Sequence, residues 1–137
     1  MPESFELTVL TPARAVLEEP VESIVAPGSE GYLGVLAHHA PLLTALVPGK
    51  LTVKSARESV RIYALSGGFL EVSDNHAVIL ADALEDPAAI DLARAQRAAE
   101  RARSRLKETP GKWDVDRAEA ALRRALNRIK VAEESRA

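Results

Sequence analysis

Arginine side chains recur at helical spacing in the last third of this 137-residue chain. Residues three or four positions apart share one face of a helix. The guanidinium group stays charged and offers forked donors that match carboxylate and phosphate oxygens. The pattern predicts arginine-rich helical faces that bind phosphates or an acidic partner. The first set is Arg94, Arg97, Arg101 and Arg105, and the second is Arg117, Arg124 and Arg128, with Arg123 beside them.

A solvated helix face is the simpler interpretation of these arginines. Ion pairs within one helix, such as Arg97 with Glu100, contribute only tenths of a kcal/mol each. The stretch from Arg94 to Arg128 holds 9 arginines and 2 lysines against 5 acids, which exceeds local compensation. Nucleic acid is the least favoured partner, since the whole chain carries a net charge of −2 and nucleic-acid-binding domains are usually basic.

The adjacent histidines His38 and His39 could suggest a metal site. Successive side chains of a strand point to opposite faces, so both could not easily hold one ion. We expect instead that one histidine points inward and hydrogen-bonds while the other faces solvent or a partner. There are no cysteines, and neither Ser29 nor Ser66 stands in a G-x-S-x-G context. The sequence predicts neither catalytic residues nor a metal site.

The loop Gly28–Tyr32 is a better candidate for contact with a partner. Glu30 and Tyr32 stand among glycines that expose the backbone, and Gly31 lies between them. The alternative is an ordinary surface turn. A partner surface at this loop would include Glu30, Gly31 and Tyr32, with His39 as a further contact.

The elements that position these residues fall into two classes. In the first 85 residues, Phe5, Leu7 and Val9 alternate with polar residues, which is typical of a half-buried strand. The apolar run that ends His76–Ala81 has the length of a fully buried strand. Turn signals recur every 8–12 residues and predict an all-β sandwich or barrel. The signals are Thr11-Pro12, Glu19-Pro20, Pro27-Gly28, Pro48-Gly49, Gly67-Gly68 and Asp74-Asn75.

A change in composition near Asp86-Pro87 marks a domain boundary. Residues 1–87 hold 5 basic and 12 acidic side chains, whereas residues 88–137 hold 13 basic and 8 acidic ones. Aspartate followed by proline is also a helix start, so we expect a β domain at 1–86 and a helical domain at 87–137.

Apolar residues in the second domain repeat at heptad spacing. The break at 108–112 and a second cap at Asp114 separate two helices of roughly 20 residues, which predicts an antiparallel helical hairpin. Alanine dominates both stripes and buries little area, so the hairpin should be marginally stable. The stripes are Leu92, Ala95, Ala99, Ala102 and Leu106, then Val115, Ala118, Leu122, Ala125, Ile129 and Ala132.

No apolar run approaches the roughly 18 residues of a membrane span, and the first residues do not read as a secretory signal. We therefore expect the chain to meet a membrane only through partners.

The order of several short motifs resembles the epsilon subunits of bacterial F-type ATP synthases. A glycine-bounded strand over 31–36 precedes His39-Ala40-Pro41-Leu42, Pro48-Gly49 and then Gly67-Gly68-Phe69-Leu70-Glu71-Val72. The similarity covers nearly the whole chain. It departs from the family at Ala37 and His38, which stand where proline and glycine are usual.

The resemblance implies a noncatalytic subunit of the rotating central stalk. Its β-sandwich would bind the gamma subunit and the c-subunit ring, which couples proton flow to rotation. Its hairpin would extend toward the alpha and beta subunits and inhibit ATP hydrolysis. The location implied is peripheral, on the cytoplasmic face of the bacterial plasma membrane. No cofactor is implied as a requirement.

The resemblance further implies a regulatory ATP site. Some family members bind ATP through a motif of Ile or Leu, Asp, two variable residues, Arg and Ala, which Ile90-Asp91-Leu92-Ala93-Arg94-Ala95 matches. No P-loop is present, so ATP would be sensed without hydrolysis. The remaining residues implied are Glu85, Arg101, Arg124 and Arg128.

Two other classes of function are compatible with the sequence. A free-standing β-sandwich ligand-binding protein with an oligomerising helical hairpin would self-associate through its heptads. The other class is an enzyme, which only the histidine pair and scattered acidic residues support.

Overall fold

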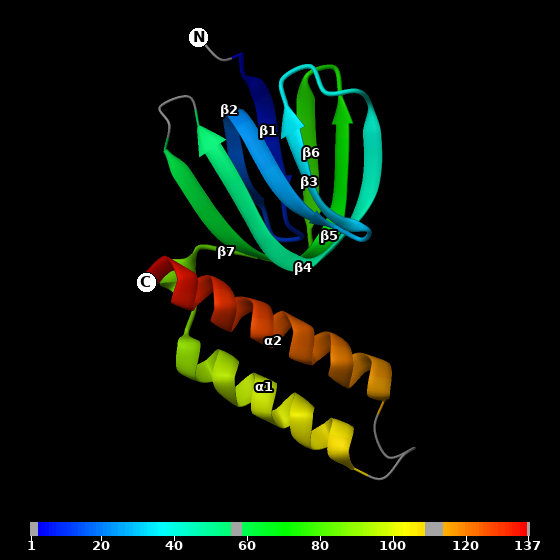
Figure 1. Ribbon diagram of the computed structural model, residues 1–137, viewed down its shortest axis with the longest axis vertical. Coiled ribbons are helices and arrows are strands. Elements are labelled where there is room, and N and C mark those ends of the chain that lie inside the picture. Colours follow the sequence, from blue (N-terminus) through cyan, green and yellow to red (C-terminus); the bar gives the residue numbers. More distant parts are fainter. Residues whose placement is uncertain (1–2, 56–58, 109–113, 137) are drawn as a thin grey trace. The chain divides into compact units, whose positions relative to one another are not determined.

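The structure is a computed structural model that describes residues 3–55, 59–108 and 114–136 (Figure 1). The chain divides into two compact units, Met1–Glu85 and Asp86–Ala137. The described residues of the first unit form strands and those of the second form helices. The predicted α+β class, with an antiparallel β-sandwich followed by a helical hairpin, is confirmed.

The first unit is a closed, barrel-like sandwich. Its sheet has the order β1-β6-β5-β4-β2-β3, and a further pairing of β1 with β2 closes it, while β7 pairs with β5. Only the β1–β6 pair is parallel among the pairings described. The strands are β1 (Phe5–Leu10), β2 (Ala15–Gly28), β3 (Gly31–Leu36), β4 (Leu42–Ser55), β5 (Val60–Ser73), β6 (His76–Ala81) and β7 (Leu84–Glu85).

Three of the expected turns are wrong, because they lie inside strands of 14 residues. Glu19-Pro20 falls within β2, Pro48-Gly49 within β4 and Gly67-Gly68 within β5. The last two pairs lie close together but offset in the β4–β5 ladder, where Pro48 is opposite Ser66 and Gly68 is opposite Leu46. Gly67 and Gly68 have φ values of 101° and 142°, which let the strand bend without ending. These residues therefore shape long strands that close the barrel.

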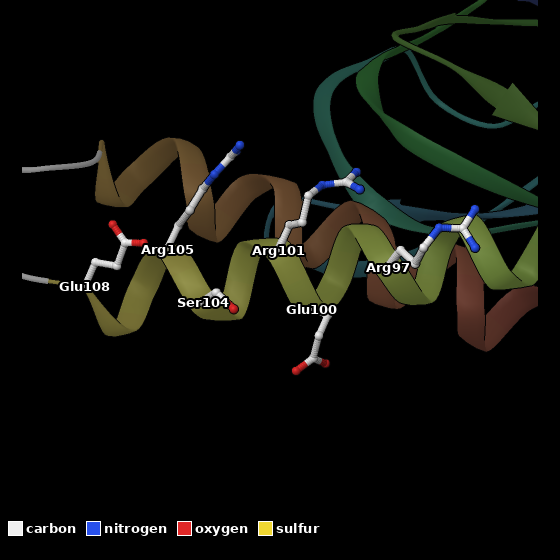
Figure 2. A pocket seen from close by; sticks show the side chains of 6 residues that line it. All are labelled: Arg97, Glu100, Arg101, Ser104, Arg105 and Glu108. Carbon is white, nitrogen blue, oxygen red and sulfur yellow. The ribbon is translucent and has the colours of Figure 1, made fainter.

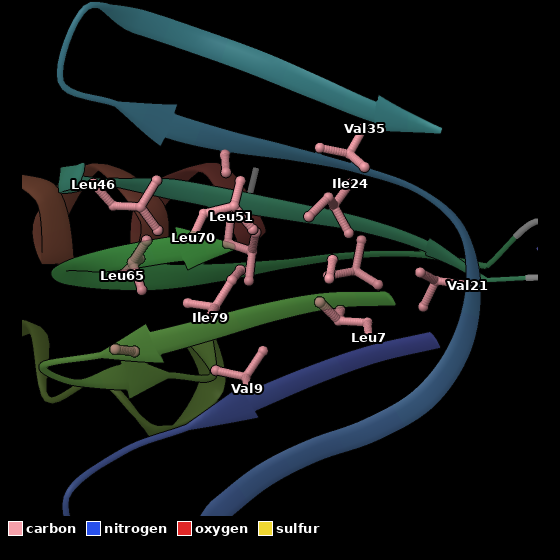
Figure 3. Close-up of a cluster of buried hydrophobic side chains, with 14 of the residues drawn as sticks. Leu7, Val9, Val21, Ile24, Val35, Leu46, Leu51, Leu65, Leu70 and Ile79 are labelled. Atoms are coloured by element: carbon pink, nitrogen blue, oxygen red, sulfur yellow. The ribbon is translucent and has the colours of Figure 1, made fainter. Parts of the chain in front are cut away.

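The alternation predicted for β1 is confirmed, since Phe5, Leu7 and Val9 are buried in the sandwich core. Figure 3 shows Leu7 and Val9 within this cluster. The expectation of a fully buried strand at His76–Ala81 is wrong. Ala77, Ile79 and Ala81 point inward, but Leu80 is 53% exposed. The uninterrupted apolar run thus places apolar side chains on both faces of β6, and the outer face of this strand is exposed.

The second unit begins with a 3-10 turn, η1 (Pro87–Ala89), and not with the long helix expected at Asp86. Asp86 accepts a hydrogen bond from Ala88 N, so it caps this short turn. The helix α1 (Leu92–Lys107) starts after a second cap, Asp91. Ile90 separates the two with extended backbone angles of φ −76° and ψ 123°. The chain therefore uses two successive aspartate caps where the sequence analysis predicted a single helix start.

The helix α2 (Val115–Arg136) is capped as expected, because Asp114 Oδ1 accepts from Arg117 N across 3.1 Å. The segment 109–113, with Trp113, lies outside the described residues. The two helices pack together along the predicted stripes, and the alanines of both stripes are buried. Within the described part of the chain, no helix is long and apolar enough to cross a membrane.

Candidate functional site

Most of the arginines of α1 form a row along one flank of the helix, and Arg103 lies outside it. Figure 2 shows Arg97, Arg101 and Arg105 extending to the same side, while Glu100 points to the opposite side. Glu100 pairs with Arg103 across 3.5 Å, so the expected Arg97–Glu100 pair is wrong. These side chains line an open hollow of about 510 Å³ together with Ser104 and Glu108. The surface suits an anion, because charge is concentrated beside open volume.

A second hollow connects the two helices near the hairpin connection. It has a volume of about 380 Å³ and is lined by Arg105, Asp114, Arg117 and Ala118. Arg101 and Arg94 share the flank of Arg105, because they are separated from it by 4 and 11 residues. By the same spacing, two further arginines of α2 share the flank of Arg117. The hairpin thus presents both rows on one side, where the residues are Arg94, Arg101 and Arg105 from α1 and Arg117, Arg124 and Arg128 from α2.

Arg124 and Arg101 come level along the hairpin. Arg136 at the end of α2 meets Ile90 before the start of α1, and both helices rise about 1.5 Å per residue. Arg124 and Arg101 lie nearly the same number of residues from that contact, so they come to the same height along the hairpin. Arg124 and Arg128 are half-buried. The four arginines that the resemblance implies for ATP therefore lie on one side of one unit. They are Arg94, Arg101, Arg124 and Arg128.

The residues of the Ile90–Ala95 motif already have structural roles. Ile90 is 3% exposed, and Ala95 is buried in the α1–α2 contact. Asp91 Oδ1 accepts a hydrogen bond from Arg94 N across 3.0 Å, which caps α1. Its other carboxylate oxygen remains available for a ligand donor. Glu85 belongs to the other unit, where it pairs with Ala64 in the β5–β7 ladder.

The candidate partner contacts lie at opposite ends of β3. Glu30 is in the two-residue connection of the β2–β3 hairpin, and Gly31 has a φ of 127°. Tyr32 is 58% exposed, yet its hydroxyl accepts from Lys50 N across 2.9 Å. His39 follows the far end of β3, about 17 Å away at 3.4 Å per residue. The tyrosine ring is therefore a fixed surface feature separate from His39.

The expected division between the two histidines holds in part, since His38 faces solvent while His39 is half-buried and hydrogen-bonded, although neither side chain belongs to the sandwich core. The side chain of His38 is 63% exposed and lies 3.1 Å from Glu3, and His39 Nδ1 donates to the neighbouring Ala40 carbonyl. His38 has a φ of 63°, a conformation that glycine adopts more readily. The described residues contain no group of three or more His, Cys, Asp or Glu that could hold a metal ion.

An apolar patch on the outer face of the sandwich is the feature that sequence reasoning missed. Leu43, Phe69 and Leu80 are 70%, 55% and 53% exposed. Strand register places Leu10 beside Leu80, Leu80 beside Phe69, and Phe69 beside Ala45. Apolar residues exposed across adjacent strands mark an interaction surface. This outer apolar patch comprises Leu10, Leu43, Ala45, Phe69, Val78 and Leu80. The signal in the sequence was the unbroken apolar run of β6, because alternate side chains of a strand point to opposite faces.

Family models match both units. The ATP synthase delta/epsilon chain β-sandwich domain matches residues 4–87, and the delta/epsilon chain long α-helix domain matches residues 89–133. The ATP synthase epsilon chain of Carboxydothermus hydrogenoformans is 52% identical over 113 residues, which are 80% of this chain and 82% of that one. The epsilon chain of Syntrophobacter fumaroxidans is 44% identical over 135 residues, covering 98% and 100%.

Solved structures of ATP synthases contain chains with a similar fold. A chain of the Euglena gracilis mitochondrial ATP synthase, resolved as OSCP/F1/c-ring, has a TM-score of 0.81 and 29% identity over 99% of this chain and 82% of its own length. A chain of the Tetrahymena thermophila mitochondrial central stalk and c-ring, at 19% identity and a TM-score of 0.60, shares the fold. With both units matched and bacterial identities above 40%, the chain belongs to the ATP synthase delta/epsilon family as an epsilon subunit, a noncatalytic component of that complex.

Proposed function

We propose that this chain works in the central stalk of a bacterial, proton-driven ATP synthase. In this role it docks on the gamma subunit and the c-subunit ring through the β-sandwich and restrains ATP hydrolysis through the hairpin. The observation that carries the docking role is the outer apolar patch, since side chains such as Leu43 would lie exposed to water without a partner. The corresponding location is the cytoplasmic face of the plasma membrane, with membrane contact only through the complex.

Substitution within the outer apolar patch tests docking on gamma. Phe69→Ser and Leu80→Ser should weaken binding to gamma at least tenfold and leave the folded unit intact, because both side chains are already more than half exposed. Leu36→Ser is the matched control, since Leu36 is 65% exposed on β3 outside the patch. Equal binding by all three variants in a titration of gamma would overturn this docking site.

The hairpin supports the regulatory role through its weak seam and its charge. Ala99 and Ala125 are each 1% exposed but contribute little area, so separation of the helices costs less free energy than in a leucine seam. The arginine rows are complementary to acidic surfaces, for which the alpha and beta subunits are the proposed partners. Ending the chain after Asp86 should leave docking intact, because the sandwich core lies within residues 5–81. The same truncation should raise the ATP hydrolysis of the complex, and unchanged hydrolysis would refute inhibition.

ATP is the proposed regulatory ligand of the compact hairpin. Arg94, Arg101, Arg124 and Arg128 lie on one side of the hairpin and would hold the phosphates, while Asp91 would accept from the nucleoside. ATP should raise the melting temperature of the isolated chain, and Arg101→Ala or Arg124→Ala should abolish that increase. Arg123→Ala is the matched control, because Arg123 is exposed and lies outside the two rows. A flat titration at millimolar ATP would remove this proposal.

Oligomerisation through the heptads, the alternative function, is not favoured. The alanines of both stripes are buried where α1 and α2 pack within one hairpin. They therefore offer no surface to a second copy of the chain.

A further inference from the structure

The last residue of α2 reaches the segment that precedes α1. Arg136 Nη2 donates a hydrogen bond to the carbonyl oxygen of Ile90 across 3.3 Å, between residues 46 positions apart. The helix α2 also contacts η1. Pro87 and Ile90, at the two ends of this joint, are buried.

The Ile90 carbonyl is an acceptor that neither neighbouring helix uses. The first hydrogen bond of α1 runs from Ala95 N to Asp91 O, so the acceptors of α1 begin one residue after Ile90. Ile90 itself closes η1 through its N–H, which donates to Pro87 O. A buried or half-buried carbonyl gains from an outside donor, and Arg136 is the donor that the hairpin supplies.

Ile90 is also the point at which the chain changes direction between two capped helical segments. Asp86 caps η1 and Asp91 caps α1, with the extended Ile90 between them. A donor on the Ile90 carbonyl therefore fixes the orientation of α1 relative to η1. Arg136 brings such a donor from α2 to this carbonyl.

We propose that Arg136 holds the two helices together at the end of the hairpin opposite the α1–α2 connection. We call this contact the latch. The two helices are joined covalently at residues 108–114, so separation starts at the other end, where Arg136 meets Ile90. The alanine seam buries little area per residue, so a hydrogen bond at this end adds measurably to the free energy that closes the hairpin. Loss of the bond frees the end of α2 and, at the same time, the joint before α1. The effect of the latch on ATP hydrolysis rests on the proposed function. Its role in holding the two helices together does not.

Hydrogen exchange on the full chain tests the latch, with Arg136→Ala as the variant. Breaking one such bond should speed exchange about three- to tenfold at the Ala89, Ile90 and Ala95 amides as well as in the last turns of α2. Loss of a favourable charge at the helix C-terminus would fray only the last turn of α2. Faster exchange at residues 89–95 thus identifies the latch, and exchange changes confined to α2 would overturn it.

Lys130→Ala is the matched control, because it removes one exposed positive charge from α2 at a position away from Ile90. Its exchange at residues 89–95 should equal that of the unmodified chain, and acceleration equal to that of Arg136→Ala would also overturn the latch. A hydrolysis assay of the assembled complex distinguishes the latch from the proposed inhibition of ATP hydrolysis by the hairpin. Arg136→Ala should lower ATP hydrolysis by favouring the open hairpin. Faster exchange with unchanged hydrolysis would support the latch and count against the inhibitory function.

Discussion

The backbone N–H of His38 donates to the side-chain oxygen of Asn75 across 2.7 Å, although 37 positions separate the two residues. The amide nitrogen of Asn75 donates in turn to Ser4 O, and its backbone oxygen accepts from Glu6 N. One turn residue therefore ties the loop after β3 to the N-terminal strand. This bond uses the backbone of His38 and survives any change of that side chain.

Replacing His38 with glycine should stabilise the sandwich. His38 has a φ of 63°, and a side chain in that region costs of order 1 kcal/mol or more. The exposed pair with Glu3 contributes little, and the unfolded-state freedom that glycine adds offsets part of the gain, so His38→Gly should raise the free energy of unfolding by up to about 1 kcal/mol. Denaturant titration measures the change. His39→Gly is the control and should destabilise, because it removes the bond to Ala40 and adds unfolded-state freedom.

Gly68 should not tolerate alanine. A Cβ at Gly68 would lie 2.0 Å from the Leu80 carbonyl oxygen, and its φ is 142°. Gly68→Ala should therefore cost about 3 kcal/mol or more, since the β5–β6 backbones would have to separate. At Gly34 the nearest atom to such a Cβ is 3.9 Å away, so Gly34→Ala should change stability by less than about 0.5 kcal/mol. Similar melting temperatures for both variants would contradict the close approach.

The Asp91 side chain should contribute to stability through capping. Asp91→Ala removes the acceptor for Arg94 N and should cost the helical unit about 1 kcal/mol. Asp91→Asn keeps an oxygen at that position, so its stability should stay within a few tenths of a kcal/mol. Loss of helical circular dichroism on heating measures both. A large cost for asparagine would show that the charge and not the cap is required.

The alanine seam should reject larger side chains. Ala99 is 1% exposed in the contact with α2, so Ala99→Leu should push the helices apart at a cost of about 1–3 kcal/mol. Ala93→Leu, on an exposed position of the same helix, should leave stability nearly unchanged. If Ala99→Leu raised the stability of the hairpin, the seam would not be closely packed.

The sequence by itself determined the classes of element and their order. Period-two alternation over Phe5–Val9 identified β1, and heptad alanines such as Ala99 and Ala125 identified the hairpin, because these patterns depend on local geometry alone. The matched arginine spacings likewise placed each row on one helix flank. Family membership followed from short motifs whose order is visible in the chain.

The tertiary structure decided what depends on residues far apart. Gly67-Gly68 reads as a turn locally, yet pairing with β4 continues the strand, since a ladder partner supplies the hydrogen bonds that a turn would otherwise form. Leu80 reads as core, but β6 has an open outer face and aligns Leu80 with Phe69 and Leu10. Arg136 reads as a terminal surface charge until antiparallel packing brings it to the Ile90 carbonyl. The hydrophobic pattern and the turns select a register only once the strands are packed together, so which distant residues become neighbours is decided by the tertiary structure.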